Sequence, residues 1–347
     1  NEFMGGVANN SRIVMNDITV KELDRFLDEQ GISTPFKKKA IKNGRNSKVW
    51  KISNPKGHWI LKQYYQHDAD KRDRLRAEAS FLELLRNIGV DTVSNVLGMN
   101  KIFNIALYSF LPGDKPTIIS SNHIRQAAKF INDINQLRYL PDSNNISPAS
   151  DACFCLLDHF NLVDNRISSL TSIKPISKLE TEVFSFVNKQ LKPAWEKLKK
   201  QLLSQFGSSQ LKKKLSFNER ILSPSDFGFH NTLEYKNNLF FVDFEYAGWD
   251  DPAKLICDFI CQPEVQVPEY QCNYFIENIQ NYLPRLSGIK SRVDYLLPLH
   301  RIKWCCILLN EFKVEDRKRR LYAGVESEGL LEDQFRKANE YFNLYVL

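Results

Sequence analysis

The feature that most constrains the fold is a change of hydrophobic period at Pro112-Gly113-Asp114. Before this point, from Phe36 onward, apolar residues alternate in short runs typical of strands, and one longer segment has helical spacing. After it, helical periodicity dominates. The sequence therefore predicts an α+β fold of two lobes, a small antiparallel-sheet lobe followed by a larger, mainly α-helical lobe.

Three regions are expected: an N-terminal extension with a short helix (residues 1–35), a sheet lobe (36–111) and a helical lobe (112–347). Thr19 and Glu22 have the spacing of a capping box, and the helix they open should stop at Gly31. In the sheet lobe we expect strands at 36–42, 48–53, 58–65, 95–102 and 105–111, with a helix at 69–88. In the helical lobe we expect helices at 122–140, 152–170 and 178–206, three or four more after Pro252, and a β-hairpin within 231–244 that turns at 236–238.

Composition favours a globular enzyme. The 347 residues are 43% hydrophobic, enough to fill a sizeable core, and the net charge of +7 is spread along the chain, so nucleic-acid binding is not expected. Seven cysteines without paired CxxC spacing fit neither a disulfide framework nor a zinc site. Because no apolar leader and no run long enough to span a membrane is seen, a soluble, cytoplasmic protein is expected.

Two polar segments carry the strongest chemical signal. Asp226 and Asn231 lie in a loop rich in Ser, Pro and Gly, where side chains are free to face a cleft, and Asp243 follows the apolar run Leu239–Val242. Isolated Asp and Asn residues in loops are often only turn formers or caps. A carboxylate that orients a hydroxyl and two oxygen ligands for Mg²⁺ are, however, what ATP-dependent phosphoryl transfer requires. The joint pattern therefore indicates a kinase.

Lys62 and Glu78 are predicted to form a buried ion pair. Strand alternation places Ile60, Lys62 and Tyr64 on one face of a strand, and Glu78 shares the apolar stripe of the following helix. A lone strand lysine usually reaches water, but a carboxylate on a packed helix face is costly unless it is paired. Lys62 paired in this way could hold nucleotide phosphates.

The turn between the first two expected strands, 36–42 and 48–53, could cover phosphate oxygens with its backbone N–H groups. It contains Gly44, Arg45, Asn46 and Ser47. With a single glycine, an ordinary hairpin turn explains the segment equally well.

These motifs resemble the aminoglycoside phosphotransferase and choline kinase family, relatives of the protein kinases, over residues 36–312. The family catalytic loop reads His-x-Asp-x-x-x-x-Asn, which Pro224–Asn231 matches except at its first position, and the Asp-Phe-Glu of choline kinases matches Asp243–Glu245. The resemblance implies a protein-kinase-like fold with ATP and Mg²⁺ as cofactors and a small hydroxyl-bearing acceptor as substrate.

The resemblance also implies roles for individual residues. Asp226 would be the catalytic base, Asn231 and Asp243 would bind Mg²⁺, and Lys62 would hold the phosphates with Glu78 as its helix partner. Three residues at the lobe junction, Ser109, Phe110 and Leu111, would form the adenine-binding hinge. Asp258 would support the catalytic loop.

Two departures from the family pattern stand out. Pro224 replaces the family histidine, so the brace that this histidine provides must come from elsewhere. Gly44 stands alone where related loops have several glycines, which leaves the phosphate cover incomplete.

The acceptor stays open between an amino alcohol, an aminoglycoside-like amine and a sugar or sugar acid. Aromatic and acidic residues near the cleft could cage an ammonium group, although Trp304 also fits a core position. These candidates are Glu245, Tyr246, Trp249, Asp250, Trp304 and Glu311. Basic residues nearby, Arg301, Lys303 and Lys313, would suit an acidic sugar instead.

Three activities are compatible with the sequence. A small-molecule O-kinase is favoured, because no Ala-Pro-Glu motif is seen and the segment between Asp243 and Asp251 is too short to dock a peptide. A protein kinase-like or nucleotidyl-transferring enzyme is the first alternative. An inactive nucleotide-binding module is the second, suggested by Pro224.

Overall fold

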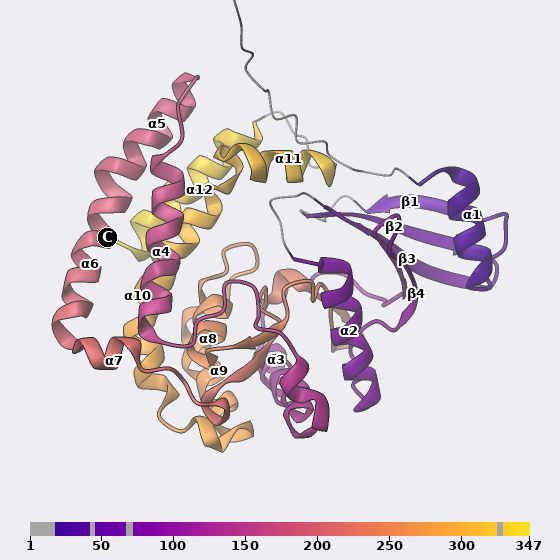
Figure 1. Cartoon of the computed structure of the whole chain (residues 1–347), viewed down its shortest axis with the longest axis horizontal. Coiled ribbons are helices and arrows are strands. Elements are labelled where there is room, and N and C mark those ends of the chain that lie inside the picture. The colour runs from indigo at the N-terminus through magenta and orange to yellow at the C-terminus, as the bar shows by residue number, and fades with distance from the viewer. Residues whose placement is uncertain (1–17, 42–45, 67–71, 325–328) are drawn as a thin grey trace, which may run out of the picture.

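The structure is a computed structural model that describes residues 18–41, 46–66, 72–324 and 329–347. Figure 1 shows a small lobe built on a sheet beside a larger helical lobe, as the sequence predicts. The sheet is antiparallel, with the strand order β1-β2-β3-β5-β4. Its strands are β1 (Lys37–Ile41), β2 (Ser47–Asn54), β3 (Gly57–Tyr64), β4 (Val96–Asn100) and β5 (Ile105–Ser109).

Strand alternation divides the sheet into two apolar faces. Leu61 and Leu107 pack with α1 (Val20–Glu29), which has the expected capping box of Thr19 and Glu22. Tyr64 and Tyr108 face the opposite way, toward α2 (Arg74–Asn87). The face that carries Lys62 is therefore the one turned toward α2 and the helical lobe (Figure 1).

Helix α2 begins later than the predicted residue 69. Asp73 is its N-cap, and the Asp73 carboxylate accepts a hydrogen bond from the backbone N–H of Arg76. The helix buries Leu75, Glu78, Leu82 and Leu85, so the predicted apolar stripe with an included carboxylate is confirmed.

The helical lobe contains more elements than the sequence analysis anticipated. Five helices, not three or four, follow Asp251 in the described residues: α8 (Pro252–Cys261), α9 (Glu269–Tyr282), α10 (Ile289–Leu308), α11 (Val314–Tyr322) and α12 (Leu330–Tyr345). The earlier helices are α3 (Ser121–Ile134), α4 (Leu156–Thr171), α5 (Lys178–Phe186), α6 (Lys192–Gln205) and α7 (Ser208–Lys212).

The single helix predicted at 178–206 is divided into α5 and α6 by a π-helical segment, Val187–Leu191. Pro193, two residues beyond this segment, has no backbone N–H to donate to the preceding turn. A π segment is a common local adjustment to such a lost hydrogen bond. Sequence periodicity could not reveal it, because the apolar spacing continues on both sides.

Two short antiparallel sheets position the polar segments. The predicted hairpin is confirmed as β7 (Thr232–Tyr235) and β8 (Asn238–Phe241), and Lys236 and Asn237 in its turn both have positive φ angles, 49° and 64°. The second pair, β6 (Ile221–Ser223) with β9 (Gly248–Asp250), was not predicted. Gly248 is required there, because a Cβ would lie 2.2 Å from the Ser147 carbonyl oxygen.

Side chains of helix α11 contact the sheet lobe, in addition to the chain segment that joins the two lobes. Arg320 donates a hydrogen bond from Nη1 to Asn46 Oδ1 at 2.8 Å. The Lys48 ammonium lies 4.4 Å from the centre of the Tyr322 ring, and the rings of Tyr65 and Tyr322 are 5.3 Å apart. The lobes are thus held together by side-chain contacts as well as by the chain.

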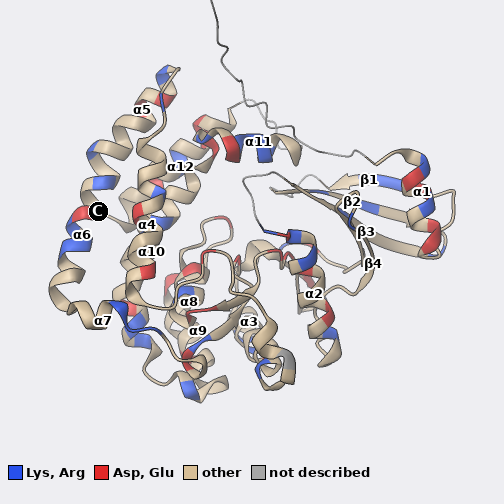
Figure 2. Ribbon diagram, in the orientation of Figure 1, with Lys and Arg blue, Asp and Glu red and all other residues tan. Residues whose placement is uncertain are grey.

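Charged residues are distributed over both lobes, with basic and acidic side chains interspersed (Figure 2). In the part of the chain that the structure describes, no helix is long and apolar enough to cross a membrane.

Candidate active site

A buried lysine links the two lobes at the base of the cleft between them. Lys62 on β3 donates from Nζ to Glu78 Oε2 at 2.6 Å and to Asp243 Oδ1 at 2.7 Å, and Glu245 Oε2 lies 3.6 Å away. Burial alone would lower the pKa of Lys62, but the carboxylates of Asp243, Glu78 and Glu245 raise it well above its usual value. Lys62 is therefore charged at any physiological pH, and the predicted pair with Glu78 is present.

Glu78 is fixed in place by more than the lysine. The Tyr64 hydroxyl donates to Glu78 Oε2 at 2.7 Å, and the backbone N–H of Phe244 donates to Oε1 at 3.2 Å. Each oxygen of the Glu78 carboxylate thus accepts a hydrogen bond, one from the sheet lobe through Tyr64 and one from the helical lobe through Phe244. Phe244 is the residue that follows Asp243. Glu78 therefore positions both Lys62 and the Asp243 segment.

Asp243 follows β8 in a left-handed backbone conformation, with φ of 71°. Non-glycine residues adopt this region at a cost, and such strain is concentrated at functional sites. Burial, with the neighbouring carboxylates of Glu245 and Glu78, raises the pKa of Asp243 to about 7 against the opposing effect of Lys62. More negative charge is gathered here than Lys62 balances, so a further cation would be stabilised.

The catalytic-loop candidate runs from the end of β6 to Asn231. Asn231 donates from Nδ2 to the backbone oxygen of Asp226 at 2.9 Å, so the amide is oriented by the loop itself. His230 Nε2 lies 3.1 Å from Asp226 Oδ1. Burial opposes ionisation of Asp226, but the contact with His230 outweighs it and lowers the pKa of Asp226. Asp226 is therefore an ionised hydrogen-bond acceptor at neutral pH.

The structure shows what braces this loop in place of a histidine at position 224. The Ser223 hydroxyl, fully buried, accepts a hydrogen bond from the backbone N–H of Ser225 at 3.0 Å. Ser225, with φ of 70°, in turn donates from its hydroxyl to the carbonyl oxygen of Ser150 at 3.3 Å. Asp226 therefore follows a residue, Ser225, whose strained backbone is held by hydrogen bonds to Ser223 and to Ser150.

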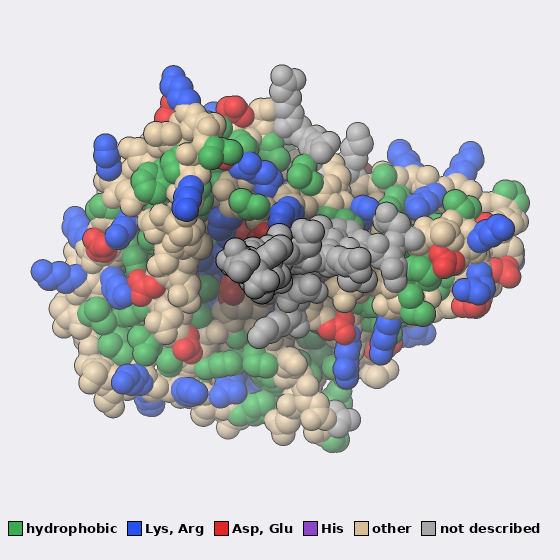
Figure 3. Space-filling view, turned by 45° about the horizontal axis from the view of Figure 1, so that its top comes forward, with side chains coloured by type: hydrophobic (Ala, Val, Ile, Leu, Met, Phe, Trp, Pro, Cys, Tyr) green, Lys and Arg blue, Asp and Glu red, His purple; other side chains and the backbone are tan. Residues whose placement is uncertain are grey.

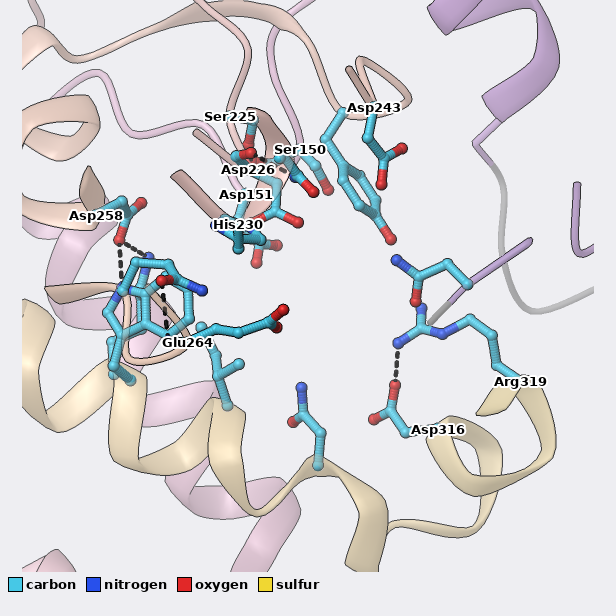
Figure 4. A pocket seen from close by; sticks show the side chains of 18 of the residues that line it. Ser150, Asp151, Ser225, Asp226, His230, Asp243, Asp258, Glu264, Asp316 and Arg319 are labelled. Atoms are coloured by element: carbon cyan, nitrogen blue, oxygen red, sulfur yellow. Dashed lines mark hydrogen bonds and ion pairs between the residues drawn. The ribbon is translucent and has the colours of Figure 1, made fainter. Parts of the chain in front are cut away.

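Two cavities meet at these residues. One, of about 430 Å³, has a largely apolar wall that includes Val49, Ile60 and Leu82 and ends at Lys62. The other is polar and contains Asp226. The residues that border both are Asn46, Lys115, His230, Asn231 and Asp243. Figure 3 shows charged side chains within a hollow on this side of the molecule, and Figure 4 shows Asp226 and Asp243 within the polar cavity.

Only some of the predicted nucleotide-binding residues line the apolar cavity. Phe110 and Leu111 line the apolar cavity. Ser109 does not, and its backbone N–H donates to the Asn95 carbonyl oxygen, so this N–H is not available to a base. The Ser47 hydroxyl donates to Glu245 at 3.3 Å. Gly44 and Arg45 lie outside the described residues.

The predicted acceptor residues divide into three groups. Tyr246 and Trp304 line the polar cavity. Glu245 borders the apolar cavity instead, fully buried and bound to Arg74 at 2.7 Å. The other three are buried and do not line the polar cavity. Trp249 donates to the Ser143 carbonyl oxygen, Asp250 binds Lys254 at 2.6 Å, and Glu311 binds Arg320 at 3.0 Å.

Asp258 binds a helix rather than the catalytic loop. Its carboxylate contacts Lys303, His300 and Trp304, all on α10. These cationic and polar neighbours overcome the effect of burial and hold the pKa of Asp258 well below its usual range. The expected support of the loop is therefore indirect, because Asp258 fixes the α10 wall of the polar cavity.

Several residues of the site were not found from the sequence. Arg74 precedes Glu78 by one helical turn on the same face, a signal that could have been used. His230 directly precedes Asn231 in the predicted loop and contacts Asp226 four residues away, a local signal that could also have been used. Asp151 and Arg166 gave no signal, because they reach the cavity only through the packing of segments distant from the loop in the chain.

No model of a known protein family matches the sequence, and no curated protein matches it significantly. Solved structures do resemble the chain. A spectinomycin phosphotransferase, solved with ADP and spectinomycin, is 15% identical, with a TM-score of 0.60 over 92% of this chain and 98% of its own.

A choline kinase from Cryptosporidium parvum is 14% identical, with a TM-score of 0.55 over 90% of this chain and 91% of its own. An ADP-bound aminoglycoside phosphotransferase is 13% identical, with a TM-score of 0.58 over 95% of this chain and all of its own, 100%. At these identities the likeness establishes the fold, and it is the two-lobe arrangement predicted from the sequence.

Proposed function

We propose that this chain, which has the fold of the aminoglycoside phosphotransferases and choline kinases, transfers the γ-phosphoryl group of ATP to a hydroxyl of a small acceptor. The observation that carries the proposal is the position of Asn231 and Asp243 on the border between an apolar cavity and the polar cavity of Asp226. A phosphoryl group passing from one bound molecule to another must cross such a border.

The apolar cavity suits the base and ribose of the nucleotide. Ile60, Leu82 and Phe110 offer apolar contact surface, and Lys62 in the same wall offers a fixed positive charge. Because Glu78 and Asp243 hold the ammonium group at 2.6 Å and 2.7 Å, it is oriented before ATP arrives. The lysine would thus neutralise the α and β phosphates at little cost in side-chain entropy.

Asn231 and Asp243 would hold Mg²⁺. Their side-chain oxygens are the ligand type that this ion prefers. Burial, together with the neighbouring carboxylates of Glu245 and Glu78, raises the pKa of Asp243 to about 7, and a divalent cation would balance that negative charge. When bound, Mg²⁺ would neutralise charge on the phosphates. Asn231 is already oriented for this role by its hydrogen bond to the Asp226 backbone.

Asp226 would accept a hydrogen bond from the acceptor hydroxyl. The lowered pKa of its carboxyl group keeps it ionised, and His230 occupies only Oδ1, so the other oxygen can receive the hydroxyl. Phosphoryl transfer has a largely dissociative transition state and needs little covalent assistance from the protein. Holding the hydroxyl in line is therefore the main contribution of Asp226.

The acceptor is a small molecule in this proposal. The segment between β8 and β9 is short and buried in part by the contact of Phe244 with Glu78. Residues of α10 and α11 line the polar cavity, where the acceptor would bind. These helices leave little room for a folded protein substrate. An inactive module is disfavoured because Ser223 takes over the bracing of the loop.

The test is a phosphoryl-transfer assay with labelled ATP, Mg²⁺ and a panel of amino alcohols, aminoglycosides and sugars, run beside the Asp226→Asn variant. We expect a labelled metabolite that depends on Asp226. Label on the protein itself would favour the protein kinase-like or nucleotidyl-transferring alternative. ATP binding without transfer to any acceptor would favour the inactive module.

A further inference from the structure

The wall of the polar cavity carries unbalanced positive charge at one place. Among the described residues, eight Lys and Arg and six Asp and Glu side chains line it, and three of the eight cations are neutralised by carboxylates behind the wall, Arg74 by Glu245, Lys254 by Asp250 and Arg320 by Glu311. The positive charge that is left over is local. The Asp316 carboxylate lies 2.5 Å from Lys313 and 2.5 Å from Arg319. One negative charge therefore balances only one of two positive charges on the part of the wall formed by α11 and Lys313 before it.

The two aromatic rings of this wall are already covered by cations of the protein. The Arg74 guanidinium lies 4.9 Å from the centre of the Tyr246 ring, and the Lys303 ammonium lies 5.7 Å from that of Trp304. An ammonium ligand binds through the free face of an aromatic ring. Here it would have a like charge beside both rings, which disfavours the cage suggested by the sequence.

A second cation stands beside the catalytic loop. Arg166 on α4 forms an ion pair with Asp151, and the residue before it, Ser150, accepts the Ser225 hydroxyl. Arg166 is therefore connected to Asp226 through a short chain of contacts. Figure 4 shows Asp151 close to Asp226, with Asp316 and Arg319 across the cavity.

The arginines of both walls keep unused donors. Nε of Arg166 and Nε of Arg319 are buried and have no hydrogen-bond partner among the residues described. Buried donors without partners are costly and uncommon. Both side chains are partly open, 21% and 18% exposed, and an arginine binds an oxyanion best when two of its N–H groups, such as Nε and Nη, are donated together.

We propose that the acceptor is a hydroxylated anion, carrying a carboxylate or a phosphate group that binds Arg166 and the Lys313–Arg319 pair while its hydroxyl faces Asp226. This inference rests on the proposed function and names its substrate class. Glu264, whose carboxylate faces the cavity, is paired with a cation of the same cavity, Lys115, at 2.7 Å.

The test uses the whole chain with Mg²⁺ and labelled ATP. D-Glucuronate and D-glucose 6-phosphate are the anionic acceptors, D-glucose is the neutral match, and choline and kanamycin are the cationic ones. We expect transfer to an anionic acceptor with a KM at least about tenfold below that of glucose. The first two acceptors distinguish a carboxylate from a phosphate.

Two variants locate the anion site. Arg166→Gln and Lys313→Gln should each raise the KM for the anionic acceptor about 10- to 100-fold and leave the KM for ATP within about twofold. Arg336→Gln is the matched control, because Arg336 is exposed on α12 and pairs with Asp333 and Glu340. Thermal unfolding of each variant checks that it is folded.

Three results would overturn the inference. Preferred transfer to choline or kanamycin would do so while leaving the proposed function standing. An equal rise in the KM for ATP in Arg166→Gln would assign this cation to the nucleotide. Transfer to no acceptor, with no ATP hydrolysis that depends on Asp226, would reject the inference together with the proposed function.

Discussion

Lys62 Nζ and Asp243 Oδ1 lie 2.7 Å apart, although 181 residues separate them in the chain. The first residue belongs to the sheet lobe and the second to the helical lobe, so this ion pair fixes how the lobes meet. The site proposed for phosphoryl transfer is organised around it.

Replacing Lys62 should impair nucleotide binding. Lys62→Met leaves Glu78, Asp243 and Glu245, whose oxygens lie within 4.8 Å of one another, without the cation they share. We expect the KM for ATP to rise about 10- to 100-fold, measured by steady-state kinetics. Lys21→Met, at an exposed position of α1, is the control, and equal effects in both variants would contradict the role of Lys62.

Replacing Asp226 should slow the chemical step alone. Asp226→Asn removes the charge that accepts the acceptor hydroxyl but keeps the shape of the side chain. We expect turnover to fall by about two to four orders of magnitude, with ATP affinity almost unchanged by calorimetry. A parallel loss of ATP affinity would show that Asp226 serves the nucleotide.

The pKa of Asp243 predicts a pH dependence of stability. Its pKa rises from 3.8 to about 7 on folding, so the folded chain binds a proton more readily than the unfolded chain. The contribution of this group to stability therefore falls as pH rises from about 4 to about 7. The Asp243→Asn variant should lose this component, which denaturant unfolding at several pH values would measure.

Magnesium should reverse part of this effect. A divalent cation favours the ionised carboxylate, so the thermal stabilisation of the protein by Mg²⁺ and ADP should grow as pH rises through about 7. The Asp243→Asn variant should show little Mg²⁺ response at any pH. A response in the parent protein that is the same at pH values about one unit below and above 7 would count against Asp243 as a ligand.

Trp249 should matter for stability and not for the acceptor. It is 4% exposed, packs on Phe217 at 4.6 Å between ring centres and does not line the polar cavity. Trp249→Ala should lower the free energy of unfolding by about 3–5 kcal/mol. At a temperature where the variant is folded, its KM values should match those of the parent protein. A rise in the KM for the acceptor alone would show that Trp249 contributes to acceptor binding.

The sequence was most informative for residues whose tertiary contacts follow from the buried face of a single strand or helix. Strand alternation placed Lys62 on the inner face of the sheet, and helical spacing placed Glu78 opposite it, because each pattern reports which face of an element is buried. The turn at Lys236 and Asn237 was predicted for a similar reason, since its residue types favour positive φ angles.

The wall of the polar cavity could be predicted only in part. Lys303 and Lys313 were named from the sequence as basic residues near the cleft, but Arg166 on α4 and Arg319 on α11 meet them only through the packing of helices that are distant in the chain. Their helical periodicity shows which face is apolar, but not which neighbour a polar residue meets. Trp249 illustrates the same limit, since an aromatic residue near a catalytic motif can equally be part of the core.

The contact between Arg320 on α11 and Asn46 beside β2 has a consequence for turnover. Any separation of the lobes that admits ATP or releases ADP has to break this contact or carry α11 along with the sheet. Under the proposed function, nucleotide exchange is therefore coupled to the C-terminal part of the chain, and changes far from the reacting groups, within α11, should alter how fast product departs.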